Sequence, residues 1–157
     1  MSSPRALDLF CGAGGMSMGL HRAGFDVTGV DLHPQPEYPF AFVQADALTF
    51  DLAGFDFIHA SPPCQRFTAY RRRPGHVAEY PNLIPAMRSR LVAAGAPWSM
   101  ENVPGAPLEY LAMLCGSMFG LEVRRHRLFE CSFGLLAPAC NHAAQVGSFP
   151  QATNRAN

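Results

Sequence analysis

Short apolar runs alternate with amphipathic stretches along the first hundred residues of this 157-residue chain. The runs are rich in β-branched and aromatic residues, which is typical of buried strands. They lie at 6–10, 25–30, 41–44, 55–60 and 98–103. Two stretches with helical periodicity, 16–23 and 82–94, fall between them. This alternation predicts βαβ units and a mostly parallel central sheet flanked by helices, which is an α/β fold.

The pattern changes in the second half of the chain. A polar, arginine-rich stretch at 66–81 has no periodicity and predicts a loop. Residues 108–118 have helical spacing, and 123–129 predict a further strand. Periodicity ends after Gly134. We therefore expect one domain over residues 1–134 and an irregular, flexible tail over 135–157.

Composition favours a cytoplasmic globular protein. Hydrophobic residues make up 48% of the chain, enough for one core, and the mean hydropathy is close to zero. No apolar run approaches the roughly 18 residues of a membrane helix, and the N-terminus lacks a signal-peptide pattern. The five cysteines are odd in number and irregularly spaced, which indicates a reducing compartment rather than a disulfide framework.

The nearest approach to a metal site in the sequence is the set Cys131, Cys140 and His142. It contains no CxxC pair and no second histidine at ligand spacing. Packing and tail positions explain these residues more simply, so we expect no metal.

Charge is unevenly distributed although the net charge is zero. Residues 1–65 carry seven acids against two arginines, whereas 66–157 carry ten arginines against five glutamates. All basic residues are arginines, which suits bidentate phosphate contacts but can equally reflect codon bias.

A glycine-rich turn follows the first predicted strand and opens the first predicted helix. Gly12, Gly14 and Gly15 would let the backbone approach a ligand closely beside the helix N-terminus. Asp31 ends the next strand, where an acid can bind both ribose hydroxyls of an adenosine cofactor. Asp46, after the third strand, could reach the adenine amino group, although a surface turn is the simpler interpretation.

The segment Ser61-Pro62-Pro63-Cys64-Gln65 follows the fourth predicted strand. Two prolines make a rigid loop at the carboxyl edge of the sheet, where open α/β sheets bind ligands. An isolated cysteine is usually a small buried hydrophobe, but this loop would hold Cys64 out of the core.

Glu101 lies on the same predicted edge, at the end of the run at 98–103. A buried acid without a partner is costly, which makes a functional role credible. Arg125 and Arg127 alternate along the strand at 123–129 and would share one face, which is more often a solvated face than a site.

Together these residues resemble the DNA (cytosine-5) methyltransferase family. Its cofactor loop, nucleophile loop, glutamate motif and arginine pair are matched in order by 8–15 (DLFCGAGG), 62–65 (PPCQ), 101–103 (ENV) and 125–127 (RHR). Four motifs in order make chance a poor explanation. The resemblance implies a Rossmann-like methyltransferase fold that uses S-adenosylmethionine, yields S-adenosylhomocysteine and needs no metal.

The resemblance also assigns residues. Catalysis falls to Cys64, Glu101, Arg125 and Arg127. The cofactor site is implied at Phe10, Gly12, Ala13, Gly14, Asp31, Leu32, Asp46, Ala47, Leu48 and Pro62. Arginine-rich positions after the nucleophile suit flanking phosphates, or else form a solvated loop: Gln65, Arg66, Arg71, Arg72 and Arg73.

The implied reaction is methylation of C5 of a cytosine flipped out of double-stranded DNA, through a covalent bond between Cys64 and C6. In the family, a target-recognition domain follows the arginine pair. The residues that follow Arg127 in this sequence are too few to form such a domain. We therefore expect a short or truncated member of phage or bacterial type, acting in the bacterial cell or infected host, in a role such as restriction–modification. Target sequence and oligomeric state are not readable.

Three interpretations stay open. The chain is active with loose specificity or with a separate specificity partner, or it is an inactive remnant that binds cofactor or DNA, or it methylates cytosine in tRNA. Retention of both Cys64 and Glu101 favours activity. No RNA-recognition module is evident, which favours DNA.

Overall fold

Seven strands form one sheet in the computed structural model, which describes residues 2–68 and 80–143. The strand order is β3-β2-β1-β4-β5-β7-β6. The strands are β1 (Arg5–Leu9), β2 (Asp26–Asp31), β3 (Ala41–Gln44), β4 (Phe57–Ala60), β5 (Trp98–Asn102), β6 (Ala112–Cys115) and β7 (His126–Cys131). The helices are α1 (Gly15–Arg22) and α2 (Ile84–Ala94), with short 3-10 turns η1 (Gln65–Phe67) and η3 (Gly116–Phe119).

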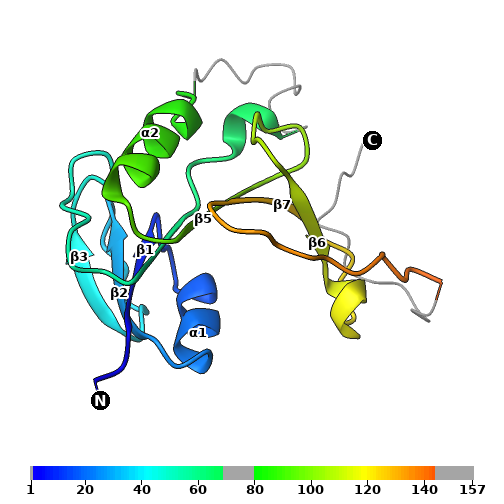
Figure 1. Ribbon diagram of the computed structural model, residues 1–157, viewed down its shortest axis with the longest axis horizontal. Helices are drawn as coiled ribbons and strands as arrows, with labels where there is room; N and C mark the ends of the chain where they lie inside the picture. Colours follow the sequence, from blue (N-terminus) through cyan, green and yellow to red (C-terminus); the bar gives the residue numbers. More distant parts are fainter. Residues whose placement is uncertain (1, 69–79, 144–157) are drawn as a thin grey trace.

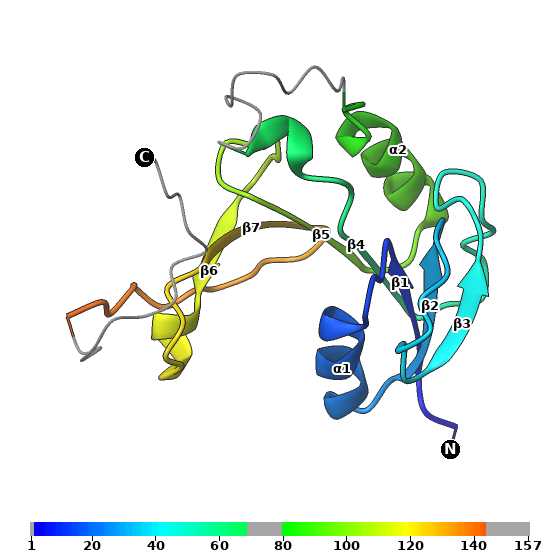
Figure 2. The same cartoon turned by 180° about the vertical axis from the view of Figure 1, so that it is seen from behind.

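Strands β1 to β5 run parallel, and only β7 pairs antiparallel, with β5 on one side and β6 on the other. Helix α1 covers one face of the sheet and α2 the other (Figures 1 and 2). The predicted α/β class and mostly parallel sheet are therefore confirmed. None of the helices within the described residues is long and apolar enough to cross a membrane.

The predicted helix at 108–118 is wrong. Its middle is strand β6, which pairs with β7, and only the 3-10 turn η3 follows. Tyr110 has φ 48°, which a continuous right-handed helix does not tolerate. Pairing with β7 supplies hydrogen bonds that local helical spacing cannot outweigh.

The hydrophobic core consists of two clusters on opposite faces of the sheet, a larger one on β1, β2, β4 and β5 and a smaller one on β1 and β2. Leu7 and Ile58 pack against Met87 and Leu91 of α2 in the larger cluster. On the opposite face, Ala6 packs against α1 in a smaller cluster. Because successive strand residues point to opposite faces, one apolar strand serves both clusters. We call β1 to β5 with α1 and α2 the body.

The far end of the sheet projects from the body as an arm, which we define as residues 112–126 and 135–143 (Figure 1). It contains β6, η3 and the first residue of β7. Residues 135–143 have neither helix nor strand. The predicted boundary at residue 134 stays a prediction, and 144–157 lie outside the described residues.

Candidate active site

A cavity of about 520 Å³ opens at the carboxyl ends of β1 and β4, within the usual size range of ligand sites. The chain reverses its order across the sheet between these two strands, and open α/β sheets bind ligands at such a point. Predicted residues from both halves of the site form its wall: Phe10, Asp31, Leu32, Asp46, Ala47, Leu48, Pro62, Cys64, Gln65, Glu101, Arg125 and Arg127.

The glycine-rich turn leaves β1 through left-handed backbone conformations. Phe10 has φ 60°, Gly12 has φ 50° and Gly14 has φ 86°. The Gly12 amide donates a hydrogen bond to Asp31 Oδ2 at 3.1 Å, which ties the turn to the end of β2. Gly12, Ala13 and Gly14 are not part of the cavity wall. Their structural role is to bring Phe10 to the cavity and to orient Asp31.

Asp46 organises the turn after β3. Its Oδ1 accepts a hydrogen bond from the Leu48 amide at 2.8 Å. Arg90 of α2 donates to the carbonyls of Leu48 and Phe50, so the helix holds this turn in place. The sequence analysis missed Arg90, because one arginine on a helix carries no local sign of such a contact.

Asp8 lies under the glycine-rich turn and is almost fully buried. Its Oδ2 accepts a hydrogen bond from the Ser17 hydroxyl, which in turn accepts one from Tyr38 at 2.7 Å. Burial raises the pKa of Asp8 to about 6, although the Ser17 hydrogen bond opposes the rise. This network ties β1 to α1 on either side of the glycine-rich turn.

Cys64 is half-buried at the start of η1 and lines the cavity. Its loop is anchored by the buried Asn102 at the end of β5, which donates through Nδ2 to the Pro62 carbonyl at 2.8 Å. Asn102 is part of the glutamate motif, yet its anchoring contact can be seen only once β5 and the nucleophile loop are side by side.

Glu101 and Arg127 form an ion pair in the cavity wall, with Oε1 and Nε 2.6 Å apart. Burial raises the pKa of Glu101 despite the lowering effects of Arg127, Arg125 and a hydrogen bond from Ser61. Burial likewise lowers the pKa of Arg127, against the pull of Glu101. Desolvation is the largest influence on the pKa of both groups, and their mutual attraction opposes it.

A chain of polar side chains leads from Glu101 into the core. His59 Nε2 lies 2.8 Å from Ser61 Oγ, and His59 Nδ1 lies 2.7 Å from Ser99 Oγ. Burial lowers the pKa of His59 to about 3, so the ring is neutral and has one donor. If Ser61 donates to the Glu101 carboxylate, His59 must donate from Nε2 and accept from Ser99 at Nδ1. The sequence analysis missed this chain, because its members come from two strands.

Only two of the five residues predicted to contact nucleic acid lie within the described part of the chain. Gln65 lines the cavity, and Arg66 donates to the Tyr80 carbonyl at 3.1 Å. Arg71, Arg72 and Arg73 lie outside the described residues.

Comparison with protein families decides the classification. Residues 5–109 match the model of the family described as C-5 cytosine-specific DNA methylase. The chain belongs to this family. The match covers the glycine-rich turn, the Cys64 loop and Glu101.

Two related methylases come from Herpetosiphon aurantiacus. The Type II methyltransferase M.HgiDI is 31% identical over 133 residues, which are 75% of this chain and 43% of that protein. The Type II methyltransferase M.HgiGI is 30% identical over 118 residues, which are 66% of this chain and 94% of that protein. The chain thus spans less than half the length of the first relative and most of the second.

Solved structures share the methylase's fold at lower identity. A DNMT2 variant from Spodoptera frugiperda superposes with a TM-score of 0.56 at 22% identity, covering 81% of this chain and 49% of that one. A tRNA (uracil-54, C5)-methyltransferase from Pyrococcus abyssi gives 0.52 at 15% identity, covering 83% and 34%. These likenesses confirm the expected Rossmann-like methyltransferase fold.

Proposed function

We propose that this methylase transfers a methyl group from S-adenosylmethionine to C5 of a cytosine in double-stranded DNA, with Cys64 as the nucleophile. The observation that carries the proposal is one cavity whose wall holds Cys64 and Glu101 together with the acids Asp31 and Asp46. Both Herpetosiphon relatives are named Type II methyltransferases, which supports the same chemistry.

The cofactor half of the cavity suits an adenosine. Asp31 is oriented by hydrogen bonds from the Gly12 and His33 amides, so its carboxylate stands ready for ribose hydroxyls. Asp46 offers an acceptor for the adenine amino group, and Phe10 and Leu48 offer apolar surface. When bound, the cofactor would supply an electrophilic methyl group on sulfur.

Cys64 would activate the cytosine. Its thiolate would form a bond to C6, and the electron pair of the C5–C6 double bond would become available at C5 for attack on the methyl carbon. As that bond forms, the bond between the methyl carbon and sulfur would break, and S-adenosylhomocysteine would leave. After transfer, a base removes the C5 proton, the double bond re-forms and the Cys64–C6 bond breaks. Pro62 and Pro63 hold the thiol loop rigid, and Asn102 anchors it, so the sulfur is positioned before the base arrives.

Glu101 would bind N3 and the exocyclic amine of the same base. Addition of the thiolate is easier if N3 is protonated, so the glutamate must deliver a proton there. The raised pKa of Glu101 is in the direction that this role needs. Arg127 pairs with Glu101, and together with Arg125 it is placed to contact the base carbonyl or an adjacent phosphate.

The base must leave the duplex to reach this cavity, at a cost of a few kcal/mol. Gln65 and Arg66 follow Cys64 directly and are our candidates for the flanking DNA contacts, with Arg71, Arg72 and Arg73. The proposal also includes a separate specificity partner or an oligomer. Residues 1–134 would form the catalytic domain.

The test is transfer of labelled methyl from S-adenosylmethionine to duplex DNA, with 5-fluorocytosine DNA as a covalent trap. We expect label at C5 and a trapped adduct with the wild-type chain, and neither with Cys64→Ala. Cys131→Ser, on β7 and outside the cavity wall, is the matched control and should retain both.

Three outcomes would overturn the proposal in whole or in part. Cofactor binding without transfer or trapping would make the chain a binding module, whereas transfer to tRNA but not to duplex DNA would change the substrate. Retained transfer in Cys64→Ala would remove the covalent mechanism.

A further inference from the structure

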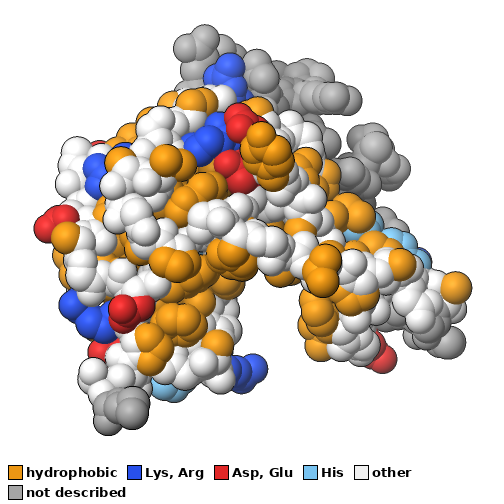
Figure 3. Space-filling view, in the orientation of Figure 1, with side chains coloured by type: hydrophobic (Ala, Val, Ile, Leu, Met, Phe, Trp, Pro, Cys, Tyr) orange, Lys and Arg blue, Asp and Glu red, His pale blue; other side chains and the backbone are white. Residues whose placement is uncertain are grey.

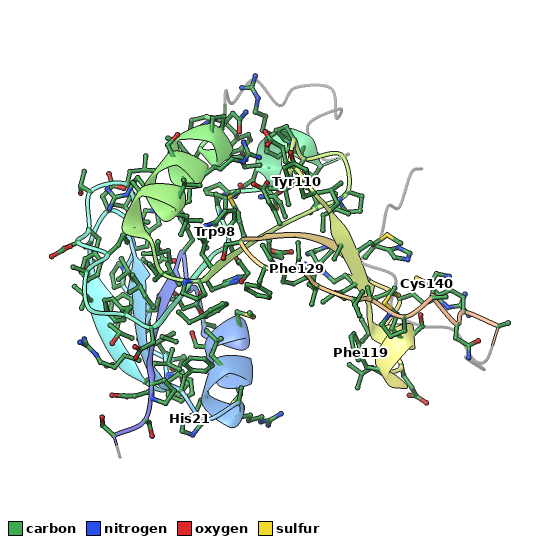
Figure 4. All side chains as sticks on the ribbon, viewed as in Figure 1. His21, Trp98, Tyr110, Phe119, Phe129 and Cys140 are labelled. Carbon is green, nitrogen blue, oxygen red and sulfur yellow. The ribbon has the colours of Figure 1, made fainter. Side chains whose placement is uncertain are left out.

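Four potential metal ligands meet in the arm, away from the cavity. They are Cys115, His126, Cys140 and His142, whose ligand atoms all lie within 4.8 Å of one another. Cys115 Sγ is 3.4 Å from His142 Nε2, and Cys140 Sγ is 3.4 Å from His126 Nε2. Figure 3 shows histidine side chains gathered on the arm, and Figure 4 places Cys140 there, far from Trp98 in the body.

The fold brings three separate segments to this point. Cys115 ends β6 and lies directly opposite His126, the first residue of β7, in the antiparallel pair. Cys140 and His142 come from residues 135–143, which are held against the rest of the arm by hydrogen bonds between backbone and side-chain groups. The Asn141 amide donates to Ser117 Oγ at 3.3 Å, and Arg124 donates to the His142 carbonyl at 2.9 Å.

Two of the ligand-to-ligand distances are close to those around a tetrahedral zinc ion, and all four atoms lie within 4.8 Å of one another. Zinc bonds of about 2.3 Å to sulfur and about 2.0–2.1 Å to nitrogen place sulfur and nitrogen ligands roughly 3.6 Å apart in a tetrahedron. The two sulfur–nitrogen distances of 3.4 Å come close to that value. A set of two thiolates and two imidazoles selects zinc over magnesium or calcium, and four protein ligands make a closed, structural site.

The arm has a physical need for such a site. Neither hydrophobic cluster contains an arm residue among the described positions. Met113, Phe119, Leu121, Val123 and Leu136 are all exposed apolar side chains of the arm. A segment that buries so little apolar surface commonly depends on a metal or on disulfides.

We propose that Cys115, His126, Cys140 and His142 bind one structural zinc ion that fastens residues 135–143 to β6 and β7. Nε2 of each histidine and Sγ of each cysteine would be the ligand atoms. Ser117 Oγ lies 3.3 Å from Cys115 Sγ and would donate to the thiolate. This site replaces the expectation of no metal, and it includes Cys140 and His142 but not Cys131, which pairs with Ser99 at the far end of β7.

The experiment measures zinc by mass spectrometry in the full-length, untagged chain, purified without chelator. We expect one zinc per chain for wild type and for Cys131→Ser, the matched cysteine outside the cluster. Cys140→Ser and His142→Asn should lose the zinc. Both alter half-buried positions, so circular dichroism should show that the body stays folded.

Replacement of zinc by Co(II) sharpens the result. Wild type should show the visible absorption of a tetrahedral Co(II) site with thiolate ligands, and Cys140→Ser should lose it. Ser117→Ala should keep the site but weaken its zinc affinity about 10–100-fold.

A wild-type chain that contains no zinc and takes up none from buffer would overturn the proposal, and the close sulfur–nitrogen pairs would then be thiol–imidazole hydrogen bonds. Equal zinc content in wild type and in both cluster variants would also overturn it. Neither readout uses methyl transfer, so failure here is separate from failure of the proposed reaction.

Discussion

The body and the arm share one sheet but are stabilised in different ways. In the body, apolar side chains of β1, β2, β4 and β5 are buried in a cluster with α2, and apolar side chains of β1 and β2 are buried in a second cluster with α1. In the arm, the described buried side chains are Cys115 and Ser117, and the apolar ones are largely exposed. The body therefore gains stability from apolar packing as well as strand pairing, whereas the described arm has strand pairing and polar contacts but little apolar packing.

Most residues of the candidate active site lie on the body, but Arg127 lies on β7 next to the first arm residue of that strand. Cys64 and Asp31 follow body strands, whereas Arg127 is the second residue of β7 and donates through Nη1 to the His126 carbonyl. His126 belongs to the proposed zinc cluster, and Arg127 pairs with Glu101. Order in the arm should therefore affect how Arg127 is held in the cavity wall.

Truncation of a core side chain in the body should have the largest effect on stability. Ile58 is fully buried at the centre of the larger cluster, so Ile58→Ala should lower the free energy of unfolding by about 2–5 kcal/mol. Urea unfolding followed through the fluorescence of Trp98, the one tryptophan of the chain, measures this loss. Zinc content in the absence of urea should not change.

Val92→Ala is the control for Ile58→Ala. Val92 lies on α2 with 63% of its surface exposed, and its truncation should change the free energy by less than about 0.5 kcal/mol. Similar losses in the two variants would mean that the body is not stabilised by the packing described.

A second prediction concerns a buried charge in the body. Asp8 has a pKa of about 6 in the folded chain, above the value of 3.8 for a free side chain. The folded state therefore holds its proton more tightly, so stability falls as pH rises through this interval and levels off above it. The difference amounts to about 2–3 kcal/mol. Asp8→Asn cannot titrate and should remove this component.

The measurement is the free energy of unfolding of both proteins from about pH 4 to pH 7. We expect wild type to lose stability relative to Asp8→Asn as pH rises. Parallel pH curves for the two proteins would show that Asp8 is not held in a desolvated site beneath the glycine-rich turn.

Much of the body could be predicted from sequence, because its strands are short apolar runs with clear ends. The strand Ala41–Gln44 was predicted with its observed bounds, and the motifs around Asp31, Cys64 and Glu101 indeed meet in one cavity. The arm could not be predicted in the same way. Its strand β6 depends on pairing with β7, a non-local contact that helical spacing at 108–118 concealed.

The polar contacts were missed for a related reason. The hydrogen bond from Asn102 to Pro62 and the chain through His59 join residues 40 positions apart or cross between strands. The cysteine and histidine cluster likewise draws on three segments, so no short ligand motif reveals it. Sequence reasoning identified residue types that carry chemistry, but only the sheet order shows which of them meet.

Truncation of an exposed apolar side chain in the arm should have the smallest effect on stability. Phe119 is 56% exposed on η3, so Phe119→Ala removes little buried surface and should change stability by less than about 0.5 kcal/mol, although the same truncation in a core costs about 3–5 kcal/mol. Chemical unfolding of the zinc-loaded chain measures it, with zinc content as the check that the arm is intact. A loss above about 2 kcal/mol would mean that the arm has an apolar core of its own, and the cluster would then be unnecessary for holding it together.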